Sequence, residues 1–223
     1  MKKEMFTTNF IRLSKGATNR NLKEIPVIDK HIRLLLGSKS PRRRELLKNA
    51  NIDFEIVDIK SDESYDPAMP VKDVAAFLSR KKSLAYLHSL NTNEILLTAD
   101  TIVVCDQKIL GKPENIGEAK KMLSLLSGRA HQVITGFCLR SPQKTEVFSA
   151  ISKVYFKILE KKEIEYYIRH FKPFDKAGAY GIQEWIGHIA VEKIEGSFYN
   201  VMGLPVAMVY DKLLHWHSVK TDK

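Results

Sequence analysis

The segment RLLLGSKSPRRRELL, residues 33–47, constrains the fold of this chain more than any other stretch. Its apolar run ends at Gly37 and is typical of a strand that is covered on both faces. Ser40 and Pro41 match the N-cap and first position of a helix that continues to about Ala50. Such a strand–turn–helix unit presents free backbone N–H groups and the positive end of a helix dipole to an anion.

Three consecutive arginines, Arg42, Arg43 and Arg44, lie in the first turns of this predicted helix. Positive side chains are unfavourable beside the positive end of the helix dipole unless an anion neutralises them. Guanidinium groups bind phosphate oxygens in a bidentate manner, so Arg42 and Arg43 are candidate phosphate ligands. A solvated helix face is the alternative reading of the run. A nucleotide-binding P-loop fits poorly because GxxxxGK[ST] is absent.

The rest of the chain alternates between predicted strands and predicted helices. We expect strands over 54–59, 94–106, 131–140, 146–158, 189–194 and 198–203, and helices over 70–90, 117–128, 160–171 and from Pro205 onward. The strands 131–140 and 146–158 should form an antiparallel hairpin that turns near 141–144. This order indicates the α/β class, with a mixed twisted sheet, flanking helices and two lobes around a cleft.

The net charge of +10 is compatible with an acidic partner such as nucleic acid. Much of this charge lies in residues 1–32, which we expect to be a weakly ordered extension. That location weakens a nucleic-acid reading. The folded domain is expected over 33–217, followed by a polar tail over 218–223.

Compartment and redox state follow from other features of the chain. No apolar stretch approaches the ~20 residues that a membrane helix needs. The N-terminus lacks the apolar core of a signal peptide. We therefore expect a cytoplasmic protein without a membrane partner. Cys105 and Cys138 lie in apolar runs and are expected to be buried, reduced thiols.

Asp100 interrupts the otherwise apolar strand LLTADTIVV. A buried carboxylate is costly unless it is paired or bound to a metal, so Asp100 is a candidate metal ligand or general base. A solvent-facing aspartate or a structural hydrogen-bond hub is the alternative. Magnesium typically takes one or two carboxylates plus substrate phosphates. Glu63 is a candidate second carboxylate, although Asp62 and Asp66 lie nearby.

Two lysines and a glutamine extend this candidate site. Lys82 lies on the helix predicted over 70–90, and Lys112 follows the Asp100 strand in a Gly-Lys-Pro turn from which it can reach a phosphate. Either lysine alone would ordinarily be solvated. In DKAGAYGIQ, residues 175–183, small residues leave room for a flat ligand, and Gln183 has both a donor and an acceptor for a base edge. Composition alone would describe this stretch only as a flexible loop.

Several motifs together, in order and spacing, resemble the Maf (septum-formation-inhibitor) family of nucleoside triphosphate pyrophosphatases. The resemblance covers about residues 33–215. It implies a mixed α/β sheet that forms a cleft, as in the inosine triphosphate pyrophosphatases. It also implies hydrolysis between the α- and β-phosphates with a divalent metal, Mg²⁺ or Mn²⁺, and a homodimer. The matching stretches are GSKSPRRRELL, ADTIV, LGKP, SGRAHQVITG, DKAGAYGIQ and YNVMGLP.

The resemblance also assigns roles to the matching positions. Asp100 would be the proton acceptor that activates water, and Glu63 would help Asp100 to hold the metal. Lys82 and Lys112 would be catalytic residues that reach the triphosphate. Phosphates would be held by Ser38, Arg42 and Arg43, and substrate specificity would depend on Arg42, Thr101 and Gln183.

The loop DKAGAYGIQ resembles the branch of the family that acts on dTTP and UTP, and CTP or modified pyrimidine nucleotides are further candidates. Glu184 and Trp185 follow where many members carry a glycine, so Trp185 either stacks on a base or only covers the loop. Three alternatives stay open: a 7-methyl-GTP pyrophosphatase, a nucleic-acid-binding protein, and a non-enzymatic inhibitor of cell division.

Overall fold

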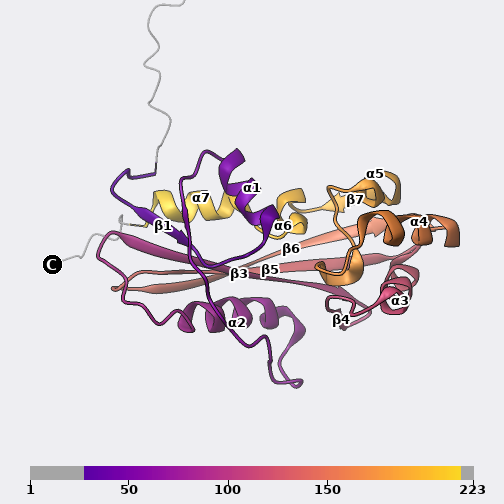
Figure 1. The fold of residues 1–223 in the computed structure, drawn as a ribbon, viewed down its shortest axis with the longest axis horizontal. Coiled ribbons are helices and arrows are strands. Elements are labelled where there is room, and N and C mark those ends of the chain that lie inside the picture. The colour runs from indigo at the N-terminus through magenta and orange to yellow at the C-terminus, as the bar shows by residue number, and fades with distance from the viewer. Residues whose placement is uncertain (1–27, 217–223) are drawn as a thin grey trace, which may run out of the picture.

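The computed structural model describes residues 28–216 (Figure 1). Residues 1–27 of the predicted extension and the tail predicted over 218–223 lie outside the described residues, so the domain limits stay predictions. Within the described part, no helix is long and apolar enough to cross a membrane. Cys105 and Cys138 are both buried and unpaired with one another, in agreement with the sequence prediction.

Strands and helices alternate in the first half of the chain and are followed by a long hairpin, as predicted. In chain order the elements are β1 (Arg33–Leu36), α1 (Pro41–Asn49), β2 (Glu55–Ile56), α2 (Val71–Leu84), β3 (Glu94–Cys105), β4 (Lys108–Leu110), α3 (Ile116–Leu126), β5 (Ala130–Arg140), β6 (Thr145–Phe156), α4 (Lys161–Phe171), the 3₁₀ turn η1 (Ala177–Ala179), α5 (Trp185–Ala190), β7 (Val191–Glu195), α6 (Phe198–Met202) and α7 (Val206–Leu214).

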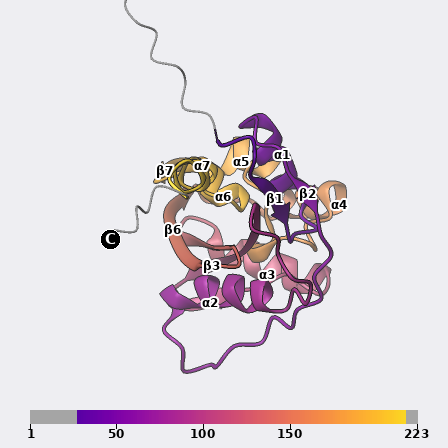
Figure 2. The same cartoon turned by 90° about the vertical axis from the view of Figure 1, so that its left-hand side faces the viewer.

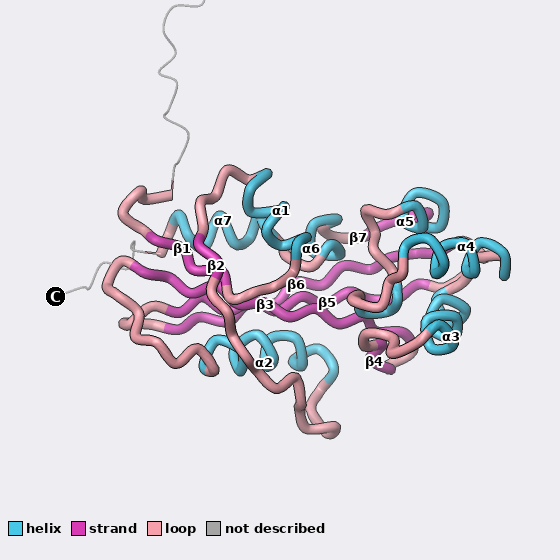
Figure 3. The backbone as a smooth tube through the Cα atoms, in the orientation of Figure 1, coloured by secondary structure: helices cyan, strands magenta, loops and turns pink. Residues whose placement is uncertain are grey.

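The strands form one mixed sheet, which confirms the predicted fold class. Its order is β2-β1-β3-β5-β6-β7, and β4 pairs with one end of β3. β1 runs parallel to β2 and β3, whereas β3, β5, β6 and β7 pair antiparallel in succession. The long strands β3, β5 and β6 run through the whole length of the molecule (Figure 3).

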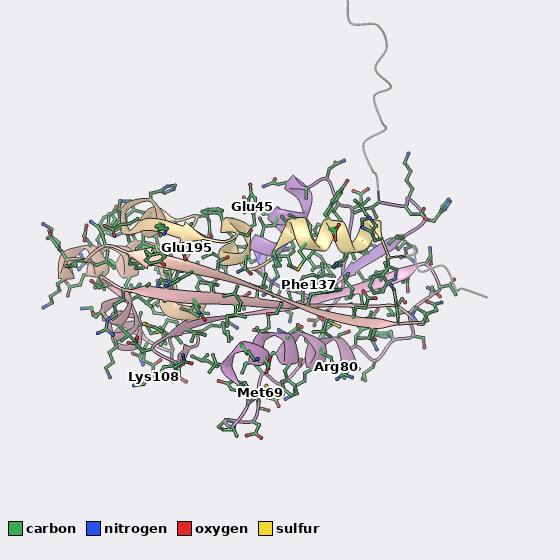
Figure 4. The ribbon with its side chains drawn as sticks, turned by 180° about the vertical axis from the view of Figure 1, so that it is seen from behind. Glu45, Met69, Arg80, Lys108, Phe137 and Glu195 are labelled. Atoms are coloured by element: carbon green, nitrogen blue, oxygen red, sulfur yellow. The ribbon has the colours of Figure 1, made fainter. Side chains whose placement is uncertain are left out.

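Helices cover both faces of this sheet. Helix α2 lies on one face, and α1, α6 and α7 lie on the other (Figures 1 and 2). All three leucines of β1 are buried, as expected for a strand covered on both faces. Phe137 is fully buried within the core, whereas Glu45, Arg80 and Lys108 are exposed (Figure 4).

Gly136 sets the distance between α2 and the sheet. It pairs with Asp100 across the β3–β5 ladder, at the centre of both strands. A Cβ atom at this position would lie 2.3 Å from the carbonyl carbon of Ala75 and 2.3 Å from the backbone nitrogen of Ala76. Only glycine allows the α2 backbone to approach so closely. This contact places the last turn of α2 beside Asp100.

The prediction of a strand over 198–203 is wrong, because these residues form helix α6. The Ser197 side chain accepts a hydrogen bond from the backbone N–H of Asn200, and Gly203 ends the helix with a φ of 115°. These capping groups outweigh the strand preference of the aromatic residues between them. The strand predicted over 189–194 begins later, at Val191, because α5 occupies the preceding residues.

Two further boundaries differ from the prediction. Helix α2 ends at Leu84 rather than near residue 90, and Arg140 donates a hydrogen bond to the carbonyl of Tyr86 where the chain leaves the helix. The strand predicted over 54–59 is reduced to Glu55–Ile56, because it is an edge strand that pairs only with the end of β1. The helix predicted from Ser40 and Pro41 begins at these residues.

Candidate active site

The candidate site is a cleft of about 460 Å³ on the side of the sheet where β1 ends. The turn after β1, the middle of β3, the loop after α4 and the end of α6 form its walls. The structure brings all nine of the predicted site residues to this one cleft: Ser38, Arg42, Arg43, Glu63, Lys82, Asp100, Thr101, Lys112 and Gln183.

Lysine and carboxylate side chains alternate along the floor of the cleft. Lys82, in the last turn of α2, donates a hydrogen bond from Nζ to Oδ2 of Asp100 at 2.9 Å and lies 3.5 Å from Oε1 of Glu63. The Nζ atom of Lys112 lies 3.5 Å from the other oxygen of Glu63. The backbone N–H of Thr101 donates to Oδ1 of Asp100 at 2.9 Å. The charge of the largely buried Asp100 is thus compensated by a lysine and a backbone hydrogen bond.

The two carboxylates fit a magnesium or manganese site. Both face the same ammonium group, so a cation that replaced this group would have oxygens from Asp100 and Glu63 within reach. No cluster of three or more histidine, cysteine or acidic side chains suited to a metal occurs among residues 28–216. Magnesium does not need one, because it commonly binds through one or two carboxylates plus substrate phosphates.

The structure distinguishes Glu63 from the other acidic residues of its segment. Asp62 is exposed and accepts hydrogen bonds from Ser64 and Lys81, and its pKa is lowered, mainly by Lys81. Asp66 accepts from the backbone N–H of Ala68. Neither carboxylate lines the cleft. Glu63 is therefore the member of this segment that can meet a ligand together with Asp100.

Arg43 is buried, and its guanidinium binds protein acceptors. Nε donates to the carbonyl of Gly203 at 2.8 Å, and Nη1 donates to the carbonyl of Ala99 at 2.9 Å. Nη1 and Nη2 also reach the hydroxyls of Ser38 and Thr101, at 3.2 and 3.1 Å. Burial lowers the pKa of Arg43, and nearby Asp100 opposes this effect. Arg43 therefore joins the turn after β1, strand β3 and the end of α6, and its role as a phosphate ligand stays a prediction.

Arg42 is arranged differently. Its guanidinium lines the cleft, and Nη1 forms an ion pair of 2.9 Å with Oδ2 of Asp175, in the loop on the opposite wall. Arg42 and Lys176 together lower the pKa of Asp175, against the effect of burial. Arg44 does not line the cleft. The three consecutive arginines thus have three different environments.

The two remaining specificity positions also differ from one another. The Thr101 hydroxyl is hydrogen-bonded to Arg43 and lies 3.0 Å from the hydroxyl of Thr135. In contrast, Oε1 of Gln183 is buried and has no hydrogen-bond partner among the described residues. Trp185 packs against the ring of Tyr166, with centroids 4.8 Å apart, and does not line the cleft. Of its two predicted roles, the structure favours covering the loop.

Sequence reasoning missed a buried pair behind the same loop. The Nε2 atom of His131 and the hydroxyl of Tyr180 lie 2.8 Å apart, and Tyr180 lines the cleft. Burial lowers the pKa of His131 to about 4 and raises that of Tyr180. Both groups are therefore neutral at pH 7. Both residues lie in motifs that match the family, SGRAHQVITG and DKAGAYGIQ, and these motifs were the sequence signals for the pair.

Known proteins match most of this chain in sequence. A family model described as Maf-like protein matches residues 33–216. A dTTP/UTP pyrophosphatase of Porphyromonas gingivalis is 48% identical over 189 residues, which cover 82% of this chain and 94% of that protein. The dTTP/UTP pyrophosphatase of Parabacteroides distasonis is 48% identical, with 84% and 97% covered, and that of Bacteroides thetaiotaomicron is 46% identical, with 83% and 96% covered. The solved Staphylococcus aureus Ham1 protein superimposes with a TM-score of 0.38 at 14% identity, over 56% of this chain and 71% of that one.

Proposed function

The chain belongs to the Maf family, and on this basis we propose that it hydrolyses dTTP and UTP to the nucleoside monophosphate and pyrophosphate. The family match and the relatives of 46–48% identity support this function. The observation in the structure that supports it is the Lys82–Asp100 ion pair, which shares one cleft with the strand–turn–helix unit of Ser38 and Arg42. The protein is thus a hydrolase that acts on the α–β phosphoanhydride bond.

We expect the residues on the two sides of the cleft to bind different parts of the substrate complex. The turn from Ser38 to Arg42 and the N-terminus of α1 would hold the triphosphate, because backbone N–H groups and a guanidinium both favour phosphate oxygens. Asp100 and Glu63 would hold Mg²⁺ or Mn²⁺ together with the phosphates. The metal, when bound, would withdraw charge from the phosphate oxygens.

Asp100 would accept the proton of a water molecule as the water oxygen attacks the α-phosphorus. The bond between the α-phosphorus and the bridging oxygen breaks, and pyrophosphate leaves. Lys82 and Lys112 would stabilise the negative charge that develops on the phosphates, which is usually the largest catalytic contribution at such a site. Lys82 already bridges both carboxylates, so it lies where metal and phosphate would meet.

A panel of nucleoside triphosphates tests this function. The protein should release pyrophosphate from UTP and dTTP in the presence of Mg²⁺ or Mn²⁺, and chelation of the metal should stop the release. Substitution Asp100→Asn should lower kcat by about three orders of magnitude or more, because it removes the proton acceptor. Asp62→Asn is the matched control, because Asp62 lies outside the cleft.

The same panel, a nucleic-acid binding assay and a cell-division assay separate the alternatives. Release from 7-methyl-GTP alone would assign the chain to the other branch of the family. A nucleic-acid-binding protein would instead show steeply salt-dependent binding without pyrophosphate release. An inhibitor of cell division would keep its effect after Asp100→Asn. No release from any nucleotide would refute the proposed function. A cytoplasmic location and a homodimer stay predictions.

A further inference from the structure

A hydrogen-bonded network lies directly behind the wall of the cleft that carries Gln183. Its centre is Glu184, the residue that follows Gln183 in the chain. The Glu184 carboxylate accepts a hydrogen bond from the hydroxyl of Tyr167 and forms an ion pair of 3.1 Å with Nζ of Lys176. Tyr167 lies on α4 and is fully buried, and Lys176 is only 7% exposed. Neither Glu184 nor Tyr167 lines the cleft.

The Tyr167 hydroxyl holds both ends of a tight turn. It accepts a hydrogen bond from the backbone N–H of Gly181 at 3.0 Å and donates to the Glu184 side chain. The backbone N–H of Glu184 closes the same turn on the carbonyl of Gly181 at 3.0 Å. Gln183 lies inside this turn, so the Tyr167 hydroxyl fixes the position of its backbone from the side away from the cleft.

Packing leaves the turn little freedom to shift. A Cβ atom on Gly181 would lie 2.9 Å from Cδ of Glu184 and 3.1 Å from Cε of Lys176. A Cβ atom on Gly187, in α5, would lie 1.7 Å from the carbonyl oxygen of Ile182. The loop therefore fits closely against the network on one side and against α5 on the other.

The same network reaches the phosphate side of the cleft. Lys176 also binds Oδ1 of Asp175 at 2.7 Å, and the second oxygen of Asp175 pairs with Arg42 at 2.9 Å. The ion pairs thus run without a gap from Glu184 to Arg42. The network therefore connects the turn that carries Gln183 to Arg42, which is also a predicted specificity position.

The chemistry of the bases shows why the position of Gln183 matters. Uracil and thymine present a ring N–H donor beside a carbonyl acceptor, whereas cytosine presents a ring acceptor beside an amino donor. A glutamine amide has one acceptor and one donor side, so one orientation matches uracil and the flipped orientation matches cytosine. Oε1 of Gln183 has no partner among the described residues that would fix its side chain directly. The groups of a base that this amide can reach therefore depend on the position of the backbone that carries it.

We infer that Glu184 and Tyr167 are positioning residues that hold the backbone of Gln183 where its amide can distinguish uracil and thymine from cytosine. The inference rests on the proposed function, because it concerns the base of the same substrate. Neither residue would touch the nucleotide. Their contribution is to keep the Gly181–Glu184 turn in one place, so that the Gln183 amide stays within reach of the base.

The test compares UTP with CTP in three variants. Tyr167→Phe removes the hydroxyl alone, and Glu184→Gln removes the charge that binds Lys176. Both should reduce the UTP-to-CTP ratio of kcat/KM by about tenfold, through a higher KM for UTP, with kcat within about twofold of the wild type. Tyr166→Phe is the control, because Tyr166 is the next residue on α4, is 46% exposed and lies outside the network. It should leave the ratio unchanged.

Each outcome bears on one claim. An unchanged UTP-to-CTP ratio in folded Tyr167→Phe and Glu184→Gln would overturn the inference. A loss that is equal for both nucleotides, or confined to kcat, would show a merely structural role and would also overturn it. A wild type that hydrolyses UTP and CTP equally well would overturn the inference too. If Tyr167→Phe does not fold, Glu184→Gln decides, because the Glu184 side chain is 19% exposed. Absence of pyrophosphate release by the wild type from every nucleotide would instead refute the proposed function.

Discussion

Lys82 Nζ lies 2.9 Å from Oδ2 of Asp100 and joins the last turn of α2 to the centre of β3. Both side chains are largely buried, at 16% and 14% exposure, so solvent screens this ion pair less than a surface pair. The lysine also lies 3.5 Å from Glu63. One ammonium group therefore occupies the position between the two carboxylates that are proposed to hold the metal.

Substitution Lys82→Met should lower kcat/KM for UTP by at least about a hundredfold. It removes the positive charge that would stabilise the negative charge developing on the phosphates. The neighbouring Lys81 provides the matched control, since it binds Asp62 and Ser64 outside the cleft. Lys81→Met should stay within about twofold of the wild type. Pyrophosphate release, measured over a range of UTP concentrations, gives both values. Equal losses in the two variants would count against a role for Lys82 in catalysis.

The three arginines of α1 should separate into three phenotypes. Arg43→Met should destabilise the protein by about 3–5 kcal/mol, because it leaves the buried carbonyls of Ala99 and Gly203 without their donor. Arg42→Met should raise KM with little change in stability, and Arg44→Met should change neither. Urea denaturation and steady-state kinetics on the same preparations would distinguish them. Normal stability of Arg43→Met would disprove the structural role assigned to Arg43.

The sequence, together with its resemblance to the Maf family, was sufficient to predict which residues meet in the cleft. Ser38, Arg42 and Asp100 lie in motifs beside or within predicted strands, and strands of one sheet bring such motifs together. The mixed α/β class followed from the same alternation of strands and helices. These features depend on local patterns and on simple rules of chain connection.

The sequence could not predict the partners that these residues have. Arg43 binds the backbone carbonyls of Ala99 and Gly203. Every residue has such a carbonyl, so the residue types do not show which one will accept a hydrogen bond. The Glu184–Tyr167 bond joins a loop to a separate helix, which only the tertiary fold brings together. The aromatic residues within 198–203 favour a strand, whereas the caps at Ser197 and Gly203 make these residues a helix.

Gly136→Ala should destabilise the protein by about 3 kcal/mol or more, because its methyl group would overlap the α2 backbone and force the helix away from β5. The displaced helix would carry Lys82 away from Asp100, so activity should fall as well. Gly111→Ala is the control, since a Cβ atom there would meet no atom within 4 Å. Thermal melts and UTP turnover should both be measured. A Gly136→Ala variant that is as stable and as active as the wild type would contradict this account of the helix–sheet contact.

His131 should make stability depend on pH between about 6.5 and 4. Burial lowers its pKa from 6.5 to about 4, so in this window the unfolded chain binds a proton that the folded chain does not. Unfolding then takes up a proton, and the free energy of unfolding must fall as the pH falls, by about 2 kcal/mol between pH 6.5 and 5 from this residue alone. His131→Gln should be less stable at pH 7 but should lack this slope, so the two curves should converge as the pH falls. His88→Gln, at an exposed position, should follow the wild type. Urea denaturation from pH 7 to pH 5 measures the difference, and parallel curves for the wild type and His131→Gln would show that His131 is not held neutral in the folded protein.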